Sequence, residues 1–385
     1  MSPSVGGVAP PYGAGTLSDL MPAVARALDV ALPDDVYPQA LPLDPSPRCC
    51  VMLVDGLGDT LLRERSGHAP YLRGRLDEVR TITAGFPTTT ATSMGSLGTG
   101  RPPGTHGLVG YEVLVPELDQ LLNELSWETP VDPRQWQPAP TVFQHVAADG
   151  VDVVRIGPAY FDGSGLTEAA LRGGRFVAAK TLDERVDAAL AALRSSPRAL
   201  VYLYWGDVDK VGHISGSGSW EWGEELAKVD AGVRRLVAEL PRDASLHVTA
   251  DHGMVDVPFG QRIDVAREPE LAQGVRHLGG EARCPQVYCE PGQAADVVER
   301  WQARLHGLAT VMTRDEAVRA GLFGPVADHV RPRIGDLVVP CQLGTAVVDT
   351  ATQRPELLRL VGLHGSLTAE ESLVPLLSVR GSQGG

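Results

Sequence analysis

The sequence is poor in positive charge, and its only lysines are Lys180, Lys210 and Lys228. Asp and Glu total 48 against 34 Lys and Arg, which gives a formal net charge of -14. Binding of a nucleic acid polymer regardless of its sequence needs clustered positive side chains, so this composition argues against such a partner. An anionic small molecule would have to be held locally, by bound metal ions or by a few arginines.

Cysteine is scarce, and long apolar runs are lacking. The chain has 5 cysteines, two of them adjacent at Cys49 and Cys50, which does not fit a disulfide framework. The longest purely apolar stretch is Ala199–Trp205, far shorter than the roughly 20 residues that cross a bilayer. No signal peptide is readable, since the first positive residue is Arg26. We therefore expect a cytoplasmic protein with no membrane partner, as a monomer or a dimer.

Short apolar runs alternate with helical patterns along most of the chain. Cys49–Val54 is apolar throughout and ends in Asp55, as expected of a strand that is buried on both faces. Similar runs, some of them less pure, recur at 151–156, 200–204 and 246–250, and helical patterns at 182–193 and 220–240. The alternation predicts an α/β fold with a mainly parallel sheet sandwiched by helices. Ligands are expected at the carboxyl ends of the strands.

The chain divides into three regions by pattern. Residues 1–45 are rich in Gly, Pro and Ala around one helical pattern at 18–30, which predicts an N-terminal arm packed on the core. Residues 256–335 hold short strand and helix patterns at 286–290, 294–305 and 310–313, which predict a small inserted α+β subdomain. Strand patterns resume at 336–339 and 345–348. We therefore assign residues 46–255 and 336–385 to the catalytic domain.

Residue types that bind metal ions occur at four places. Asp55 follows the first apolar run, Asp209 and His213 follow the run at 200–204, Asp251 and His252 follow the run at 246–250, and His364 lies in Gly-Leu-His-Gly. Each of these alone is as well explained by a turn or a helix N-cap. Together, three carboxylates and three imidazoles favour Zn²⁺ or Mn²⁺ over Ca²⁺ or Mg²⁺. Six ligands exceed what one tetrahedral ion needs, so two divalent ions are predicted.

A threonine-rich turn lies between the first two of these places. In Phe-Pro-Thr-Thr-Thr90, hydroxyl residues follow a proline and precede a stretch that is compatible with a helix. This would place a side-chain oxygen and free backbone N–H groups at a helix N-terminus, where an anion is favoured. A threonine hydroxyl is a poor nucleophile unless a base or a metal assists it, and the alternative interpretation is a simple N-cap.

Taken in order, these motifs resemble the alkaline phosphatase superfamily, and within it the type I phosphodiesterase/nucleotide pyrophosphatase family. The resemblance rests on Asp55, Phe-Pro-Thr-Thr-Thr90, Thr-His-Gly107, Asp209-Lys-Val-Gly-His213, Ala-Asp251-His252-Gly-Met and Gly-Leu-His364-Gly. It implies that one metal is held by Asp209, His213 and His364. The other would be held by Asp55, Asp251 and His252, with Thr90 as a further ligand.

The resemblance also implies that Thr90 is the nucleophile, with Thr88 and Thr89 as fallback assignments. Displacement would then proceed in two steps through a covalent threonyl-phosphate. Members of the family often have an Asn downstream of the nucleophile that holds a phosphate oxygen, whereas this chain has Tyr111 there. The backbone N–H of Ala91 is expected to share that role.

The substrate implied is a nucleotide phosphodiester. A monoester carries more negative charge, and residues 85–100 contain neither Arg nor Lys to meet it. The resemblance extends to actinobacterial enzymes that open cyclic di-AMP and cut the linear dinucleotide to AMP. The alternatives are a phosphomonoesterase, a phosphonate hydrolase of the same superfamily, or a nucleotide sensor without turnover. Aromatic residues that could stack on a base are Tyr111, Trp127, Trp136, Tyr160 and Phe161.

Overall fold

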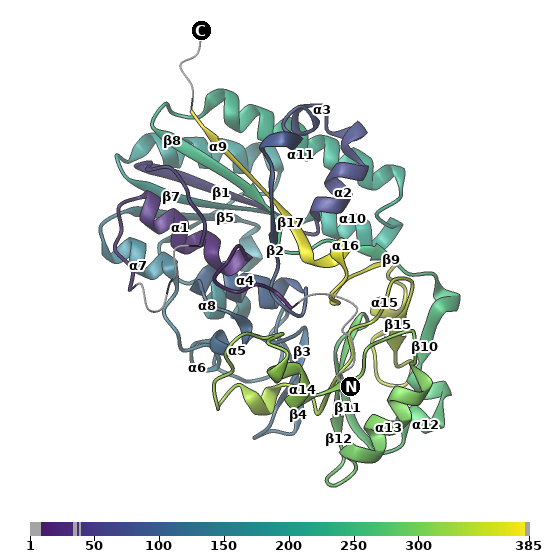
Figure 1. Cartoon of the computed structure of the whole chain (residues 1–385). Helices are drawn as coiled ribbons and strands as arrows, with labels where there is room; N and C mark the ends of the chain where they lie inside the picture. The colour runs from purple at the N-terminus through teal and green to yellow at the C-terminus, as the bar shows by residue number, and fades with distance from the viewer. Residues whose placement is uncertain (1–8, 34–36, 38–39, 382–385) are drawn as a thin grey trace.

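The main sheet of the molecule has seven strands in the order β2-β17-β8-β1-β7-β5-β6. The computed structural model describes residues 9–33, 37 and 40–381 (Figure 1). The strands are β1 (Arg48–Val54), β2 (Arg80–Thr83), β5 (Asp152–Gly157), β6 (Arg175–Ala178), β7 (Ala199–Trp205), β8 (Ala244–Thr249) and β17 (Leu373–Arg380). Strands β8, β1, β7, β5 and β6 run parallel, and β17 is antiparallel to both β8 and β2. The expected mainly parallel α/β sheet is confirmed.

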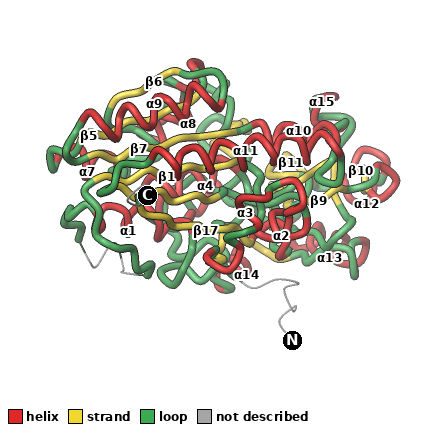
Figure 2. Tube along the Cα trace, turned by 90° about the horizontal axis from the view of Figure 1, so that it is seen from above, coloured by secondary structure: helices red, strands yellow, loops and turns green. Residues whose placement is uncertain are grey.

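Helices cover the sheet in two groups. One comprises α9 (Leu182–Ser195) and α11 (Trp220–Glu239), and the other comprises α1 (Leu20–Ala27), α4 (Thr90–Thr99), α7 (Val142–Ala148) and α8 (Gly165–Ala170). Helix α9 packs on β7 and α11, whereas α4 packs on α1, α7 and α8 (Figure 1). Figure 2 shows β6, β5, β7, β1 and β17 following one another across the molecule. Every residue of β1 after Arg48 is buried, as its uninterrupted apolar run predicts.

Helix α4 can approach its neighbours closely because it is built from small residues. Residues 91–99 of this helix are all buried. A Cβ atom at Gly98 would lie 1.9 Å from the carbonyl oxygen of Ala170 in α8, so only glycine fits there. The helix ends at Gly100, whose φ of 67° is the left-handed conformation that often closes a helix. This packing fixes the position of the helix N-terminus, where Thr90 lies.

A smaller lobe follows the main run of strands. Its four-stranded sheet has the order β11-β12-β14-β13, and two short pairs, β10-β15 and β16-β9, lie beside it. Its elements are β9 (Val255–Asp256), β10 (Arg262–Asp264), α12 (Pro269–Ala272), β11 (Val275–Glu281), β12 (Cys284–Cys289), α13 (Ala294–Arg304), β13 (Met312–Thr313), α14 (Arg314–Arg319), β14 (Leu337–Val338), β15 (Ala346–Val348), α15 (Pro355–Leu358) and β16 (Gly362–Leu363). Most of these elements lie at the lower right of Figure 1, with α14 nearer its lower centre.

The return of the chain to the main sheet differs from the sequence prediction. The strand patterns at 336–339 and 345–348 were assigned to the catalytic domain, but β14 pairs with β12 and β13, and β15 pairs with β10. The boundary at residue 335 therefore falls between two strands of one sheet. An apolar run of two or three residues fits either sheet, because its pairing partner is chosen by tertiary contacts. Strand β17 is the one that returns.

The remaining elements connect these parts. They are the hairpin β3 (Glu112–Val115) and β4 (Gln120–Asn123), and the short helices α2 (Asp59–Glu64), α3 (Pro70–Arg73), α5 (Pro103–His106), α6 (Pro133–Trp136), α10 (Asp207–Ser215) and α16 (Ala369–Ser372). Of the expected N-terminal arm, α1 packs against α4 and α7, while residues 1–8, 34–36 and 38–39 lie outside the described part. No helix among the described residues is long and apolar enough to span a membrane. All five cysteines are described, and each is buried and free.

Candidate active site

The predicted metal ligands gather where parallel strands of the main sheet end. Asp55 follows β1, and Asp251 and His252 follow its neighbour β8, while Asp209 and His213 lie in α10 just after β7, its other neighbour. Adjacent parallel strands end at the same edge of a sheet, so these side chains meet there. His364 arrives from the distant end of the chain. It follows β16, which pairs with β9 only a few residues after His252.

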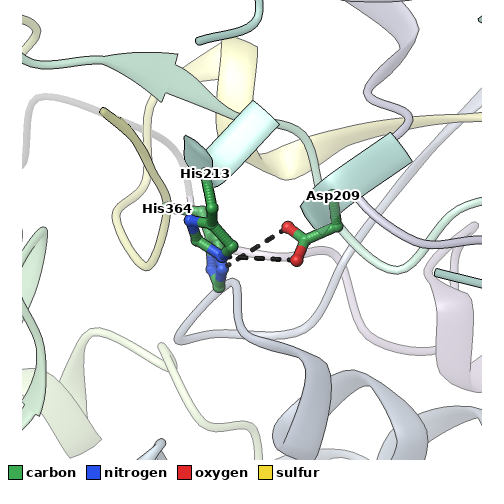
Figure 3. A group of neighbouring side chains, drawn as sticks. All are labelled: Asp209, His213 and His364. Atoms are coloured by element: carbon green, nitrogen blue, oxygen red, sulfur yellow. Dashed lines mark ion pairs between the residues drawn. The ribbon is translucent and has the colours of Figure 1, made fainter. Parts of the chain in front are cut away.

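The six residues form two groups. Asp209, His213 and His364 make one group, and Asp55, Asp251 and His252 make the other, each with ligand atoms within 4.8 Å of one another. In the first, His213 Nε2 and His364 Nε2 lie 3.3 Å and 3.9 Å from the Asp209 carboxylate (Figure 3). In the second, His252 Nε2 lies 3.4 Å from Asp55 and 3.5 Å from Asp251. The His252 and His364 rings stack with centroids 3.7 Å apart, so the two groups adjoin.

Each carboxylate of the two groups has one oxygen atom that is buried without a hydrogen-bond partner. These atoms are Asp55 Oδ1, Asp209 Oδ1 and Asp251 Oδ2. The other oxygen of Asp55 accepts a hydrogen bond from the Tyr204 hydroxyl, and that of Asp251 accepts from the backbone N–H groups of Gly56 and His252. A buried acceptor without a partner is costly. The unpaired atoms fit divalent cations as their missing partners.

The three histidines are all oriented in the same way by the backbone. The Nδ1 atoms of His213, His252 and His364 lie 2.7 to 2.9 Å from the carbonyl oxygens of Gly362, Gly253 and Thr88. When Nδ1–H donates to a carbonyl, the neutral ring presents Nε2 as an acceptor, which is the tautomer that binds a metal. In each group it is Nε2 that faces the carboxylates.

The charge of this cluster also calls for cations. Burial, followed by the neighbouring carboxylates of Asp251 and Asp209, raises the pKa of Asp55 well above its usual value. Burial and the neighbouring His252 lower the pKa of His364 well below its usual value. Among the residues that the structure describes, the ion-pair partners of the three carboxylates are the histidines of the cluster alone. Three ionised carboxylates can share this space only with added positive charge, and carboxylate with imidazole suits Zn²⁺ or Mn²⁺.

A glycine after β1 allows the two groups to lie this close. Gly56 has φ of 73°, and a Cβ atom there would lie 2.9 Å from Cα and Cβ of Asp209. Any side chain would therefore push α10 away from the end of β1. The glycine after Asp55 thus allows Asp55, in the second group, to lie close to α10, which carries Asp209 and His213 of the first group.

The structure separates the roles of the three adjacent threonines. The Thr88 hydroxyl donates to the Ser366 carbonyl at 2.8 Å, and the Thr89 hydroxyl donates to Glu281 at 2.6 Å. Thr90 is the first residue of α4, and its Oγ1 lies 3.3 Å from His252 Nε2. Its hydroxyl makes no hydrogen bond to any other described residue. Thr90 therefore has the hydroxyl that is available beside the second group.

Two pockets open on either side of Thr90. The aromatic pocket has a volume of about 500 Å³ and is lined by Asp55, Thr90 and Asp209 together with Tyr160, Phe161, Phe176 and Tyr204. The acidic pocket has a volume of about 300 Å³ and is lined by Thr90, Ala91, Tyr111, Glu112, Glu281 and His364, among others. Both pockets are therefore lined by the threonine to which the resemblance assigns the role of nucleophile.

The expected oxyanion donors and stacking residues divide between these pockets. Ala91 and Tyr111 line the acidic pocket beside Thr90, and burial raises the pKa of the Tyr111 phenol to about 12, which keeps it protonated as a donor. Tyr160 and Phe161 line the aromatic pocket. Trp127 and Trp136 line neither; their Nε1–H groups donate to the Val131 carbonyl and to Glu124.

Two functional candidates were missed by the sequence reasoning. Tyr204 is the last but one residue of β7, and its hydroxyl donates to Asp55. Glu281 ends β11 in the small lobe, where it accepts from Thr89, and burial raises its pKa to about 8. Alternation along β7 could have pointed to Tyr204. No local signal marks Glu281, because its place depends on how the small lobe docks on α4.

Solved structures show the same fold in known proteins. An inactive variant of murine ectonucleotide pyrophosphatase/phosphodiesterase 5, in which a threonine is replaced by alanine, in complex with AMP, matches with a TM-score of 0.69 and 20% identity over 86% of this chain and 87% of that chain. The human counterpart matches with a TM-score of 0.67 and 18% identity, over 86% and 87%. Phosphonoacetate hydrolase from Sinorhizobium meliloti 1021 in complex with phosphonoacetate matches with a TM-score of 0.65 and 20% identity, over 88% and 91%. No curated protein matches the sequence.

The family comparison is more specific than the fold. The model of the type I phosphodiesterase/nucleotide pyrophosphatase family matches residues 49–367, a span from the first residues of β1 to just beyond His364. All six candidate ligands and Thr90 lie within it. The chain belongs to the type I phosphodiesterase/nucleotide pyrophosphatase family of the alkaline phosphatase superfamily, and it is a phosphoric diester hydrolase.

Proposed function

We propose that the protein hydrolyses phosphodiester bonds of small nucleotides through a covalent phosphate ester on Thr90, in a site with two Zn²⁺ or Mn²⁺ ions. The observation that carries this proposal is the Thr90 hydroxyl, which lies 3.3 Å from His252 Nε2 and has no other hydrogen-bond partner in the described part of the chain. The neighbouring threonine hydroxyls are committed to Ser366 and Glu281. The murine relative noted above is inactive with a threonine changed to alanine, which agrees with a threonine nucleophile.

The six ligands would hold the ions in the two groups already described. When bound, such ions lower the pKa of a nearby hydroxyl and offset the negative charge of phosphate oxygens. Backbone carbonyls hold the three histidines in the tautomer that this requires. The hydroxyl of Tyr204 holds Asp55 in place from the opposite side.

The chain itself supplies the nucleophile and its alignment. Thr90 Oγ1 would attack phosphorus, forming an Oγ1–P bond as the bond from phosphorus to the leaving oxygen breaks. The hydroxyl proton passes to solvent, and the leaving oxygen takes up a proton. Water then attacks phosphorus from the leaving-group side, the Oγ1–P bond breaks, and Thr90 regains its proton. The unpaired N–H groups at the start of α4, including that of Ala91, and the Tyr111 phenol would orient the phosphate oxygens.

The substrate proposed is a nucleotide diester, including cyclic di-AMP and the linear dinucleotide, which would be cut to AMP. The murine relative was solved with AMP, and the aromatic pocket next to Thr90 offers rings on which a base can stack. A cytoplasmic location and a monomer or dimer complete the proposal. A phosphonate hydrolase is the second candidate, because the bacterial neighbour of similar fold acts on phosphonoacetate.

The test is a set of three alanine variants at adjacent positions. We expect Thr90→Ala to keep metal and AMP binding but to lose nearly all single-turnover hydrolysis of cyclic di-AMP and of bis-p-nitrophenyl phosphate. Thr90→Ser should retain much more, and a protein adduct that carries the nucleotide or p-nitrophenyl phosphate group should be trapped only when residue 90 has a hydroxyl. Thr88→Ala and Thr89→Ala are the matched controls.

Three results would contradict the proposal. If Thr90→Ala were about as active as wild type, Thr90 could not be the nucleophile. Turnover mainly of p-nitrophenyl phosphate would indicate a monoesterase, and turnover mainly of phosphonoacetate would indicate a phosphonate hydrolase. Binding of AMP with no turnover of any ester would indicate a sensor.

A further inference from the structure

Arg155 is a buried cation with no hydrogen-bond or ion-pair partner among the described residues, and it lines the aromatic pocket. The residue lies in β5 and is 7% exposed. Its Nε and Nη1 atoms are buried and make no hydrogen bond. Leaving a guanidinium charge buried and unpaired destabilises the folded protein. Because this unpaired guanidinium lies in the lining of a pocket, it is available to a ligand that enters the pocket.

The sheet register holds Arg155 in a row of aromatic side chains. Arg155 is paired with Phe176 on β6 and with Tyr202 on β7, so the three side chains share one face of the sheet. The guanidinium carbon lies 5.8 Å from the centre of the Phe176 ring. Strand β5 lies two places from β1 in the sheet order, a separation of about 10 Å at the usual strand spacing. Arg155 thus lies across the pocket from the strand that ends in Asp55.

The acidic groups near Arg155 do not pair with it. Glu168 in α8 makes two hydrogen bonds with Arg134, at 3.0 Å and 2.7 Å. Asp162 is exposed to solvent. The guanidinium is therefore not a structural ion pair of the fold.

The other cations of the aromatic pocket are already engaged or lie at its edge. Arg185 donates to the backbone carbonyls of Ala179, Lys180 and Tyr204. Lys210 is exposed, on the helix that carries Asp209. Among the described residues that line this pocket, Arg155 is the one buried cation that has no acceptor.

We propose that Arg155 is a specificity-determining residue that donates hydrogen bonds to the acceptor atoms on the edge of a nucleobase, while the base lies among the aromatic rings of this pocket. This inference rests on the proposed function, in which a nucleotide phosphate sits at Thr90. Phe161 and Tyr204, whose ring centres are 5.2 Å apart, line the same pocket as Thr90 and Arg155. A planar guanidinium suits the ring nitrogens and carbonyl oxygens at the edge of a base.

A second phosphate is the less suitable occupant of this end of the pocket. A terminal phosphate carries up to two negative charges and needs several donors, whereas one unpaired guanidinium is present. The surrounding rings offer faces for stacking, and Asp207, which also lines this pocket, would repel an anion. A base gains from both the rings and the single cation.

The experiment compares ligands that differ only in the base. Binding of AMP and of ribose 5-phosphate in the presence of Mn²⁺ is measured by calorimetry for wild type, Arg155→Met and Arg175→Met. We expect Arg155→Met to weaken AMP binding by roughly 10- to 100-fold, the range for a hydrogen bond to a charged group, with little effect on ribose 5-phosphate. Arg175→Met is the matched control, because Arg175 is exposed on the neighbouring strand and pairs with Asp152.

A second measurement separates a ligand role from a structural one. Methionine fills a similar volume without charge, so Arg155→Met should unfold at the same temperature as wild type or at a higher one. A marked fall in the unfolding temperature would mean that Arg155 supports the fold, and the inference would be wrong.

The binding data have two further outcomes that would overturn the inference. Equal loss of AMP and ribose 5-phosphate affinity would place Arg155 on the phosphate at Thr90. Adenosine 3′,5′-bisphosphate has one phosphate more than AMP. If Arg155→Met weakened binding of this ligand but not binding of AMP, Arg155 would contact a second phosphate. The binding experiment does not depend on turnover. Failure of the diesterase assays would therefore refute the proposed function, while the binding data would still test the role of Arg155.

Discussion

A buried ion pair between Arg283 and Glu371 joins the small lobe to the segment that follows His364. Both side chains are 0% exposed, and Arg283 Nε and Nη2 donate to the carboxylate at 3.1 Å and 2.6 Å. Glu371 also accepts from the Ser366 N–H at 3.0 Å and from the Thr368 hydroxyl at 2.6 Å. We predict that Glu371→Gln lowers the free energy of unfolding by about 3–5 kcal/mol, the cost of leaving a buried charge uncompensated.

The magnitude follows from how the four hydrogen bonds are shared. Each oxygen of Glu371 accepts two of these hydrogen bonds. In glutamine, the NH₂ group that replaces one oxygen can only donate, so two donors of the protein would face another donor and lose their acceptor. Glutamine has the same shape, so no cavity adds to the loss. With an unfolding entropy near 2.1 cal/mol/K per residue, a chain of 385 residues gives about 0.8 kcal/mol/K. The predicted fall in Tm is therefore about 4–6 °C.

The assay is thermal unfolding followed by circular dichroism, with a matched exposed pair as control. Arg304 and Glu268 form a similar ion pair, but their side chains are 39% and 29% exposed. Glu268→Gln should therefore change Tm by only about 1 °C. The double variant Arg283→Met with Glu371→Leu should recover much of the loss, because it removes both charges. If Glu371→Gln and Glu268→Gln lowered Tm equally, the reasoning from burial would be refuted.

The remaining predictions concern the metal groups and acid stability. Asp251→Asn should lower the bound Zn²⁺ or Mn²⁺ measured by elemental analysis and reduce diester hydrolysis by more than roughly 100-fold. The control Asp264→Asn, at the N-cap of a short helix in the small lobe and outside both metal groups, should do neither. Chelation should abolish hydrolysis, with Mn²⁺ or Zn²⁺ restoring it better than Ca²⁺; full recovery with Ca²⁺ alone would contradict the ligand set. Burial lowers the pKa of His106 to about 3, so the unfolded chain takes up the proton first as pH falls below about 6.5, and about 2 kcal/mol of stability is lost by pH 5. His106→Gln should lose less Tm between pH 7 and pH 5 than wild type does, and equal losses would show that His106 is not the group responsible.

The sequence by itself determined the sheet and where its polar ends lie. Uninterrupted apolar runs such as those of β1 and β7 are buried between two layers of helices, so these strands and the less pure run of β8 were readable as central parallel strands. Because such strands end at one edge, Asp55, Asp209 and Asp251 were predictable as neighbours. The prediction of Zn²⁺ or Mn²⁺ came from residue types alone, since few metal ions prefer a mixture of carboxylate and imidazole ligands.

Tertiary structure decided what short or distant segments do. Strands β14 and β15 have two and three residues, too few for a pattern to choose between sheets, and they joined the small lobe. Local sequence does not distinguish Thr88, Thr89 and Thr90. Their roles differ because the partners that occupy the first two hydroxyls arrive from residues 281 and 366. Arg155 also has no sequence signal, because a missing partner is a property of the packed molecule. Hydrogen bonds between distant segments depend on docking geometry, which a linear pattern does not contain.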